Sequence, residues 1–246
     1  MSDTVLSFYD HLASDYHLIF ANWDEAVIRQ GQELRAILES LHAGKKLLDC
    51  SCGIGTQAIG LAKQGYQVYA TDLSPMSVQR AKQEATRLEV EIDFNVADMR
   101  ELESVIMDKF DVIISCDNSV PHLLNDADLE QAAASLYNRL HDGGILLISI
   151  RDYDEILEAK PQTTPIRVLE NRLTFQLWEW NEDIYTVHHF ILTEDNLAQW
   201  QTRHNVREDA ALGRADLTRF IEQAGCKDVQ WHLSGYYQPV LTARKI

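Results

Sequence analysis

Apolar positions along this chain follow two periods, one typical of buried strands and one typical of amphipathic helices. Short apolar runs predict strands over 46–50, 67–71, 91–95, 110–115 and 144–150. Helical spacing between these runs predicts helices over 56–64, 75–88, 100–105 and 126–140. Strands that alternate with helices of this length favour an α/β fold with a doubly wound, mostly parallel sheet covered on both faces.

The first 44 residues precede this alternation and show only the helical period. Their apolar residues predict helices over 7–20 and 23–41, or one broken helix. We expect residues 1–44 to form a helical lid. A length of 246 residues suits one doubly wound domain with a modest insertion, so we expect a single domain over 1–246.

After residue 150 the pattern changes to long segments rich in β-branched and aromatic residues. These segments predict strands over 167–178, 184–192 and 200–208. We expect them to form a small antiparallel insertion, within residues 160–212, over the carboxyl edge of the sheet. The last elements return to the sheet and are predicted as a helix over 214–224 and strands over 227–233 and 238–244.

The turn between the first strand and the next helix carries the strongest chemical signal. Gly53 and Gly55 allow a sharp turn and leave no side chain between the backbone and a ligand. The following helix offers its N-terminus to a polar or anionic group. The second strand ends at Asp72, close to the spacing at which an acidic side chain meets ribose hydroxyls. The pattern predicts a nucleoside-type cofactor at the carboxyl ends of two parallel strands.

These residues also have other interpretations. Gly53-x-Gly55-x-x-Ala58 fits the dinucleotide fingerprint, so an NAD-dependent oxidoreductase is an alternative. Asp49 argues against it, because a carboxylate so near the turn repels a pyrophosphate and suits a cation. Taken singly, Asp72 could cap the next helix, and Asp49 could accept hydrogen bonds from backbone donors. Asp98, after the third strand, could simply solvate a loop.

Four successive motifs, spanning roughly residues 45–154, resemble those of class I S-adenosylmethionine-dependent methyltransferases. They are Asp49-x-x-Cys52-Gly53-x-Gly55-Thr56, Asp72-Leu73-Ser74, Ala97-Asp98-Met99 and Phe110-Asp111-Val112-Ile113. The resemblance implies S-adenosyl-L-methionine as the cofactor and a Rossmann-like sheet of seven strands, the last of them antiparallel. It also implies that Asp72 binds the ribose, that Asp98 binds the adenine amino group, and that Leu73 and Met99 flank the ring. The full set of expected cofactor-binding residues is Arg29, Asp49, Cys52, Gly53, Gly55, Asp72, Leu73, Ala97, Asp98, Met99 and Cys116.

Two further segments, 115–123 and 150–154, are similar to those of glycine and sarcosine N-methyltransferases. This resemblance implies that Arg151 and Asn118 hold the carboxylate of a small amino acid, which suits a guanidinium fork and an amide. Arg151 could instead form an internal salt bridge, and for His122 we favour a role in anchoring its loop. Asp117 and Asp152 depart from the family pattern, and their negative charge could favour a more cationic, larger amine.

We therefore expect methyl transfer to the amine nitrogen of glycine, sarcosine or a related amino acid. Tyr16 and Tyr153 join Asn118 and Arg151 as candidate catalytic residues, and Asp117, Tyr153 or Tyr16 could accept the proton of the amine. An oxygen or carbon acceptor on another small metabolite and a non-catalytic cofactor-binding protein are the alternatives.

Composition narrows the partners. A net charge of −16 without any basic run argues against nucleic acid. No apolar run approaches the roughly 18 residues of a membrane span, so we expect a soluble cytoplasmic protein. The four cysteines lack zinc spacing, and the adjacent His188 and His189 alternate sides of a strand, so no metal site is expected. The oligomeric state stays open.

Overall fold

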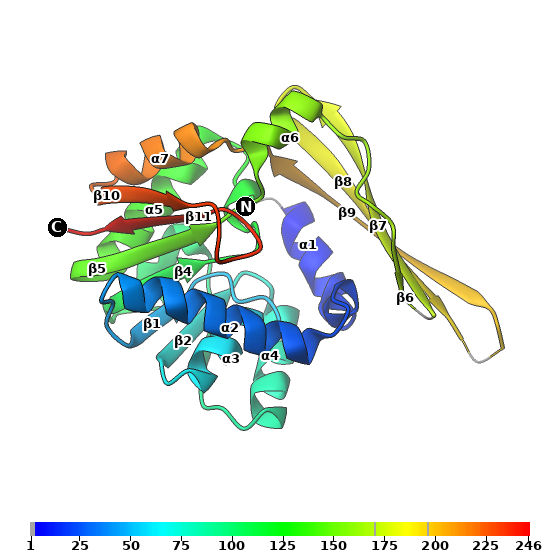
Figure 1. Cartoon of the computed structure of the whole chain (residues 1–246), viewed down its shortest axis with the longest axis horizontal. Helices are drawn as coiled ribbons and strands as arrows, with labels where there is room; N and C mark the ends of the chain where they lie inside the picture. The colour runs from blue at the N-terminus through cyan, green and yellow to red at the C-terminus, as the bar shows by residue number, and fades with distance from the viewer. Residues whose placement is uncertain (1–2, 170, 196) are drawn as a thin grey trace.

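A computed structural model describes residues 3–169, 171–195 and 197–246 of the chain. Its main sheet has seven strands in the order β10-β11-β5-β4-β1-β2-β3, and β11 runs antiparallel to both of its neighbours (Figure 1). These strands are β1 (Lys46–Asp49), β2 (Gln67–Asp72), β3 (Asp93–Val96), β4 (Phe110–Ser115), β5 (Leu140–Ser149), β10 (Lys227–His232) and β11 (Val240–Arg244). The predicted fold class is confirmed, including the antiparallel last strand.

Helices cover both faces of this sheet. One face is covered by α2 (Trp23–Ser40), α3 (Thr56–Lys63) and α4 (Pro75–Arg87), and the other by η2 (Met99–Ser104), α5 (Asp126–Arg139) and α7 (Arg214–Gln223). Alternate residues of each strand enter opposite cores, as Leu47 and Leu48 do in β1. Because both faces are buried, the central strands read as continuous apolar runs. None of the helices in the described ranges is long and apolar enough to cross a membrane.

The antiparallel segment forms a separate four-stranded sheet beside the main one (Figure 1). Its strands are β6 (Arg167–Leu169), β7 (Arg172–Asn181), β8 (Ile184–Glu194) and β9 (Trp200–Ala210). The single strand predicted over 167–178 is wrong, because the chain reverses between Leu169 and Arg172, which pair with each other. Asn171 belongs to this reversal, and asparagine is a residue that turns favour.

The N-terminal segment lies between the two sheets (Figure 1). It comprises α1 (Asp3–Leu12), which packs against β9, and the short 3-10 helix η1 (Tyr16–Ile19). The helix predicted over 7–20 is therefore wrong in both its start and its continuity. Ser14 and Asp15 lie at the break, and such side chains compete with helix hydrogen bonds. Two short helices, α6 (Tyr153–Ala159) and η3 (Val120–His122), have no counterpart among the predicted elements.

The backbones of α2 and α3 touch where Gly31 faces Gly60. A Cβ atom built on Gly60 would lie 2.5 Å from the Val27 carbonyl oxygen, and one on Gly31 would lie 2.5 Å from the Gly60 carbonyl. Trp23 Nε1 adds a hydrogen bond of 2.9 Å to Thr56 Oγ1 at the start of α3. The glycines thus fix α2 tightly against the helix that leaves the glycine turn.

Gly60→Ala should lower the free energy of unfolding by about 1–3 kcal/mol, because backbone has to move to admit the methyl group. Urea unfolding followed by circular dichroism measures this change. Gln32→Ala, at an exposed position of the same helix pair, is the matched control and should leave stability nearly unchanged. Equal urea midpoints of unfolding for Gly60→Ala and Gln32→Ala would contradict the explanation by close backbone contact between α2 and α3.

Candidate active site

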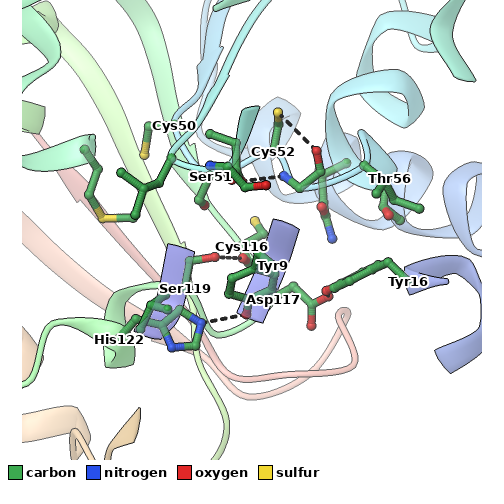
Figure 2. A pocket seen from close by; sticks show the side chains of 18 of the residues that line it. Tyr9, Tyr16, Cys50, Ser51, Cys52, Thr56, Cys116, Asp117, Ser119 and His122 are labelled. Carbon is green, nitrogen blue, oxygen red and sulfur yellow. Dashed lines mark hydrogen bonds between the residues drawn. The ribbon is translucent and has the colours of Figure 1, made fainter. Parts of the chain in front are cut away.

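A cavity lies at the carboxyl ends of the central parallel strands, and α1 forms part of its wall. Its walls come from the loops after β1, β2, β3 and β4 and from the N-terminal segment, as Figure 2 shows for the labelled side chains. The lining residues include Val5, Leu6, Tyr9, Tyr16, Cys50, Ser51, Cys52, Gly53, Thr56, Gln57, Asp72, Leu73, Ala97, Met99, Cys116, Asp117 and His122.

The glycine turn forms the floor of this cavity. Gly53 and Gly55 have φ angles of 53° and 95°, the left-handed region in which glycine is strongly preferred. A Cβ atom on Gly53 would meet nothing within 4 Å, so open space lies directly beside this backbone. Asp72 braces the turn, because its Oδ2 accepts a hydrogen bond of 2.8 Å from the Gly53 backbone N–H.

Asp72 is a carboxylate with capacity left for a ligand. Its Oδ1 accepts a hydrogen bond from the Ser74 backbone N–H at 2.9 Å, and each oxygen keeps a further lone pair. Burial raises the pKa of Asp72, while the Ser74 and Gly53 donors oppose that shift. Ser74 caps α4, since its Oγ accepts a hydrogen bond from Ser77 N–H, so the carboxylate of Asp72 is not the cap.

Asp49 lies buried under the same turn. Its Oδ1 accepts a hydrogen bond from the Ser51 N–H at 3.2 Å, and its Oδ2 has no hydrogen-bond partner in the described part of the chain. Burial raises the pKa of Asp49 to about 7. A buried carboxylate oxygen without a donor is costly, and a cationic ligand group at the turn would remove that cost.

Four expected cofactor-binding residues do not line this cavity: Asp49 and Gly55, which lie in or under the glycine turn, and Asp98 and Arg29. Arg100 binds the carboxylate of Asp98, with Nη2 at 2.7 Å from Oδ2, and the charge of Arg100 outweighs burial and lowers the pKa of Asp98. Arg29 lies on the exposed side of α2, 3.7 Å from Glu33, and lines a second cavity instead. Leu73, Ala97, Met99, Cys52 and Cys116 do line the first cavity.

The groups around the first cavity fit S-adenosylmethionine. The open space beside Gly53 admits a ligand against the backbone, and the unpaired Asp49 oxygen suits an ammonium group. Asp72 offers charged acceptors to ribose hydroxyls, and Leu73, Ala97 and Met99 offer apolar surface to a base. Burial raises the pKa of the Cys52 and Cys116 thiols well above their usual range, so these side chains act as neutral packing groups.

A second cavity, of about 510 Å³, opens between the main sheet, the N-terminal segment and the antiparallel sheet. Its lining includes Phe20, Arg29, Gln30, Arg151, Arg167, Thr174, Phe175, Gln176, His189 and Tyr237. Asp117 is the one described residue that lines both cavities. The two cavities therefore adjoin at Asp117, and ligands bound in the two cavities would come closest to each other there.

Two tyrosines from distant parts of the chain hold Asp117. Tyr16 donates a hydrogen bond of 2.9 Å to Oδ2, and the two side chains point toward each other in Figure 2, while Tyr237 donates to Oδ1. Burial and the nearby Asp117 raise the pKa of Tyr16 well above its usual range, so Tyr16 stays a neutral donor. Asp117 and Asn118 have φ angles of 61° and 69°, a strained backbone typical of functional sites.

Arg151 lines the second cavity with a side chain that is 23% exposed. Its Nη1 donates to the Tyr185 hydroxyl at 3.2 Å and its Nη2 to Gln176 Oε1 at 3.3 Å. The Arg151 backbone N–H donates to Asn118 Oδ1 at 3.1 Å. Asn118 Nδ2 is buried and has no hydrogen-bond partner among the described residues. Arg151 thus lines the second cavity while neutral groups hold its position, together with a long ion pair of 4.0 Å to Asp209 Oδ2.

Tyr153 lies behind Arg151 rather than on either cavity. It is fully buried, and its hydroxyl is 2.9 Å from that of Tyr185. Tyr185 also donates to Asp209 Oδ2 at 3.4 Å. The geometry gives Tyr153 contact with the hydroxyl that supports Arg151.

Asp209 joins the antiparallel sheet to the loop after β4. Its Oδ1 lies 2.8 Å from Arg207 Nε and 2.8 Å from His122 Nδ1. Burial opposes ionisation, but Arg207 and His122 lower the pKa of Asp209 well below its usual range. His122 Nε2 in turn lies 2.7 Å from the Tyr9 hydroxyl. His122 therefore has the contacts of an anchoring residue.

Several residues around the cavities were missed from the sequence. Tyr9 comes from α1, where its spacing from Leu6 by three residues signals a shared helix face. Tyr237 follows β10, and Arg167, Gln176 and His189 come from the antiparallel sheet. For these four the sequence carries no local signal of proximity to Asp117.

Comparison with known proteins agrees with this site. A family model described as a methyltransferase domain matches residues 47–144. The chain is 31% identical over 155 residues to a glycine/sarcosine N-methyltransferase of Aphanothece halophytica. It is 30% identical over 157 residues to one of Parasynechococcus marenigrum. Each alignment covers 61% of this chain but only 58% and 55% of the relatives, so less than two thirds of either relative is matched.

Solved structures share the fold. An S-adenosylmethionine-dependent methyltransferase from Clostridium acetobutylicum aligns with a TM-score of 0.78 at 14% identity, covering 88% of this chain and 91% of that one. The S-adenosylmethionine-bound amino pentose methyltransferase CalS10 from Micromonospora echinaspora aligns with a TM-score of 0.70 at 17% identity, covering 89% and 92%. These likenesses show that this chain has the fold of S-adenosylmethionine-dependent methyltransferases, and the matched methyltransferase domain covers its central parallel strands.

Asp72→Asn should weaken binding of S-adenosylhomocysteine about 10- to 100-fold, because a hydrogen bond to a charged acceptor contributes about 1.5–3 kcal/mol. Isothermal titration calorimetry measures the dissociation constant directly. Asp142→Asn, near the start of β5 and remote from the cavity, is the charge-matched control. Unchanged affinity in Asp72→Asn would remove Asp72 from the cofactor site.

Binding of S-adenosylhomocysteine should tighten as pH rises through about 7, because Asp49, with its pKa raised to about 7, becomes ionised there and attracts the ligand ammonium. Calorimetric titrations between pH 5.5 and 8.5 follow this change. The corresponding inflection should be absent in Asp49→Asn. An identical profile in both proteins would assign the effect to another group.

Proposed function

We propose that this chain transfers a methyl group from S-adenosylmethionine to the nitrogen of a small amine that carries a carboxylate or similar anion. The observation that carries this proposal is the junction at Asp117, which lines both the cavity at the glycine turn and a second cavity lined by Arg151. The named activity of the glycine/sarcosine relatives agrees with such an acceptor.

The two ends of the acceptor would meet different groups. Asp117 offers an anionic acceptor, held by Tyr16 and Tyr237, to an amine at the junction. Arg151 offers a guanidinium, and Asn118 Nδ2 an unpaired donor, to the anion of the acceptor. Tyr153 serves as a positioning residue, because it contacts the Tyr185 hydroxyl that supports Arg151.

The chain's contribution to catalysis is orientation. Bound in the first cavity, S-adenosylmethionine supplies an electrophilic methyl group. Asp117, Arg151 and Asn118 hold the acceptor amine in line with that methyl group. Such alignment can lower the activation free energy of methyl transfer by up to about 7–11 kcal/mol. Tyr9 and Tyr16, from the proposed lid over residues 1–44, cover the cavity and exclude water from it. Asp117 is placed to accept the proton that the methylated amine releases.

The proposal is tested by transfer of labelled methyl groups from S-adenosylmethionine to glycine, sarcosine and a panel of other amines. Arg151→Gln should raise the KM for carboxylate-bearing amines at least about tenfold, since it removes charge-assisted hydrogen bonds, and should leave the affinity for S-adenosylhomocysteine unchanged. Arg219→Gln, on the surface of α7, is the control. Label on an oxygen or carbon acceptor, with none on any amine, would overturn the proposal.

A further inference from the structure

The second cavity is larger than a simple amino acid requires. Its volume of about 510 Å³ lies within the roughly 300–1,000 Å³ of most small-molecule sites and is several times that of a small amino acid. Glycine or sarcosine, with only a few non-hydrogen atoms, would leave most of this space to water. The size of the cavity therefore indicates a longer acceptor that extends from Asp117 toward the antiparallel sheet.

The charge of this cavity is opposite to that of the whole chain. Its charged lining residues are three arginines and one acid, namely Arg29, Arg151, Arg167 and Asp117, in a protein with a net charge of −16. Burial, followed by Arg207 and Arg151, lowers the pKa of His189 to about 3, so this lining imidazole is neutral. Such a local excess of positive charge attracts anions.

The arginines keep donors for a ligand. Arg207 binds Asp209 at 2.8 and 3.1 Å, whereas Arg151 approaches that carboxylate only to 4.0 Å. Arg167 Nη1 donates to the Ile19 carbonyl at 3.0 Å and forms no ion pair with a described carboxylate. A guanidinium carries five N–H donors, so these contacts leave several unused.

We propose that the acceptor is an amine with a dianionic group, such as a phosphate monoester or a dicarboxylate, at the end remote from the reacting nitrogen. Arg167, Arg151 and Arg29 bind the dianion, and Asp117 receives the amine. Arginine is suited to this task because its planar fork pairs bidentately with phosphate and carboxylate groups. This inference rests on the proposed methyl transfer to an amine and specifies the class of substrate.

The test compares acceptors that share an amine and differ at the far end. Serine is paired with O-phosphoserine, ethanolamine with O-phosphoethanolamine, and alanine with aspartate, and formation of S-adenosylhomocysteine gives kcat/KM. The dianionic member of at least one pair should exceed its partner by about tenfold or more, equivalent to 1.4 kcal/mol. Preference within the phosphate pairs identifies a phosphate monoester, and preference within the third pair identifies a dicarboxylate.

Two variants test the assigned arginines. Arg167→Gln and Arg29→Gln should each reduce the dianion preference at least threefold and leave the affinity for S-adenosylhomocysteine unchanged. Arg172→Gln is the matched control, because Arg172 also donates to a carbonyl of the N-terminal segment, that of Phe20, but does not line the cavity. Inorganic phosphate should compete with the acceptor and not with S-adenosylmethionine.

Equal kcat/KM within every pair, or a preference that survives in both variants, would overturn the dianionic acceptor. Methylation of glycine or serine would then still support the proposed function. Failure of every amine to accept label, in a protein that binds S-adenosylhomocysteine, would instead overturn the proposed function itself.

Discussion

The buried carboxylate of Asp209 is the interaction on which the arrangement of both cavities depends. It binds Arg207 on its own strand, His122 in the loop after β4 and, through its second oxygen, Tyr185 on β8. Breaking such a buried pair by removing one partner is strongly destabilising, because a charge stays buried without compensation. Asp209 therefore ties the antiparallel sheet, which supplies Arg167, Thr174, Phe175, Gln176 and His189 to the second cavity, to the part of the chain that forms the first cavity.

The cofactor half of the site could be predicted because its signals are local. The turn at Gly53 and Gly55, the acid at the end of β2 and the cap at Ser74 each lie within a few residues of the element they shape. Asp98 shows the limit of this reasoning. Arg100, only two residues further along, binds its carboxylate, and this partner lies just outside the Ala97-Asp98-Met99 motif.

The acceptor half could be predicted only in part, because its contacts join distant segments. Asp117 and Tyr237 are 120 residues apart, and His122 and Asp209 are 87 apart. No periodicity in the chain encodes such pairs, and Arg151 was placed at the acceptor through family resemblance alone. Arg29 is different, because its neighbours Val27, Gln30 and Gly31 are buried while its own side chain lies on the exposed side of α2, at the second cavity and not at the first.

The contact between Gly31 and Gly60 has a consequence for how ligands enter. Since no atoms can be added between these backbones, α2 cannot tilt or slide on α3 without losing the contact. Asn22, which caps α2 through its bond from Glu25 N–H, marks the end of this fixed region. A hinge that let the N-terminal segment uncover the first cavity would therefore have to lie ahead of Trp23, with α1 and η1 as its moving part.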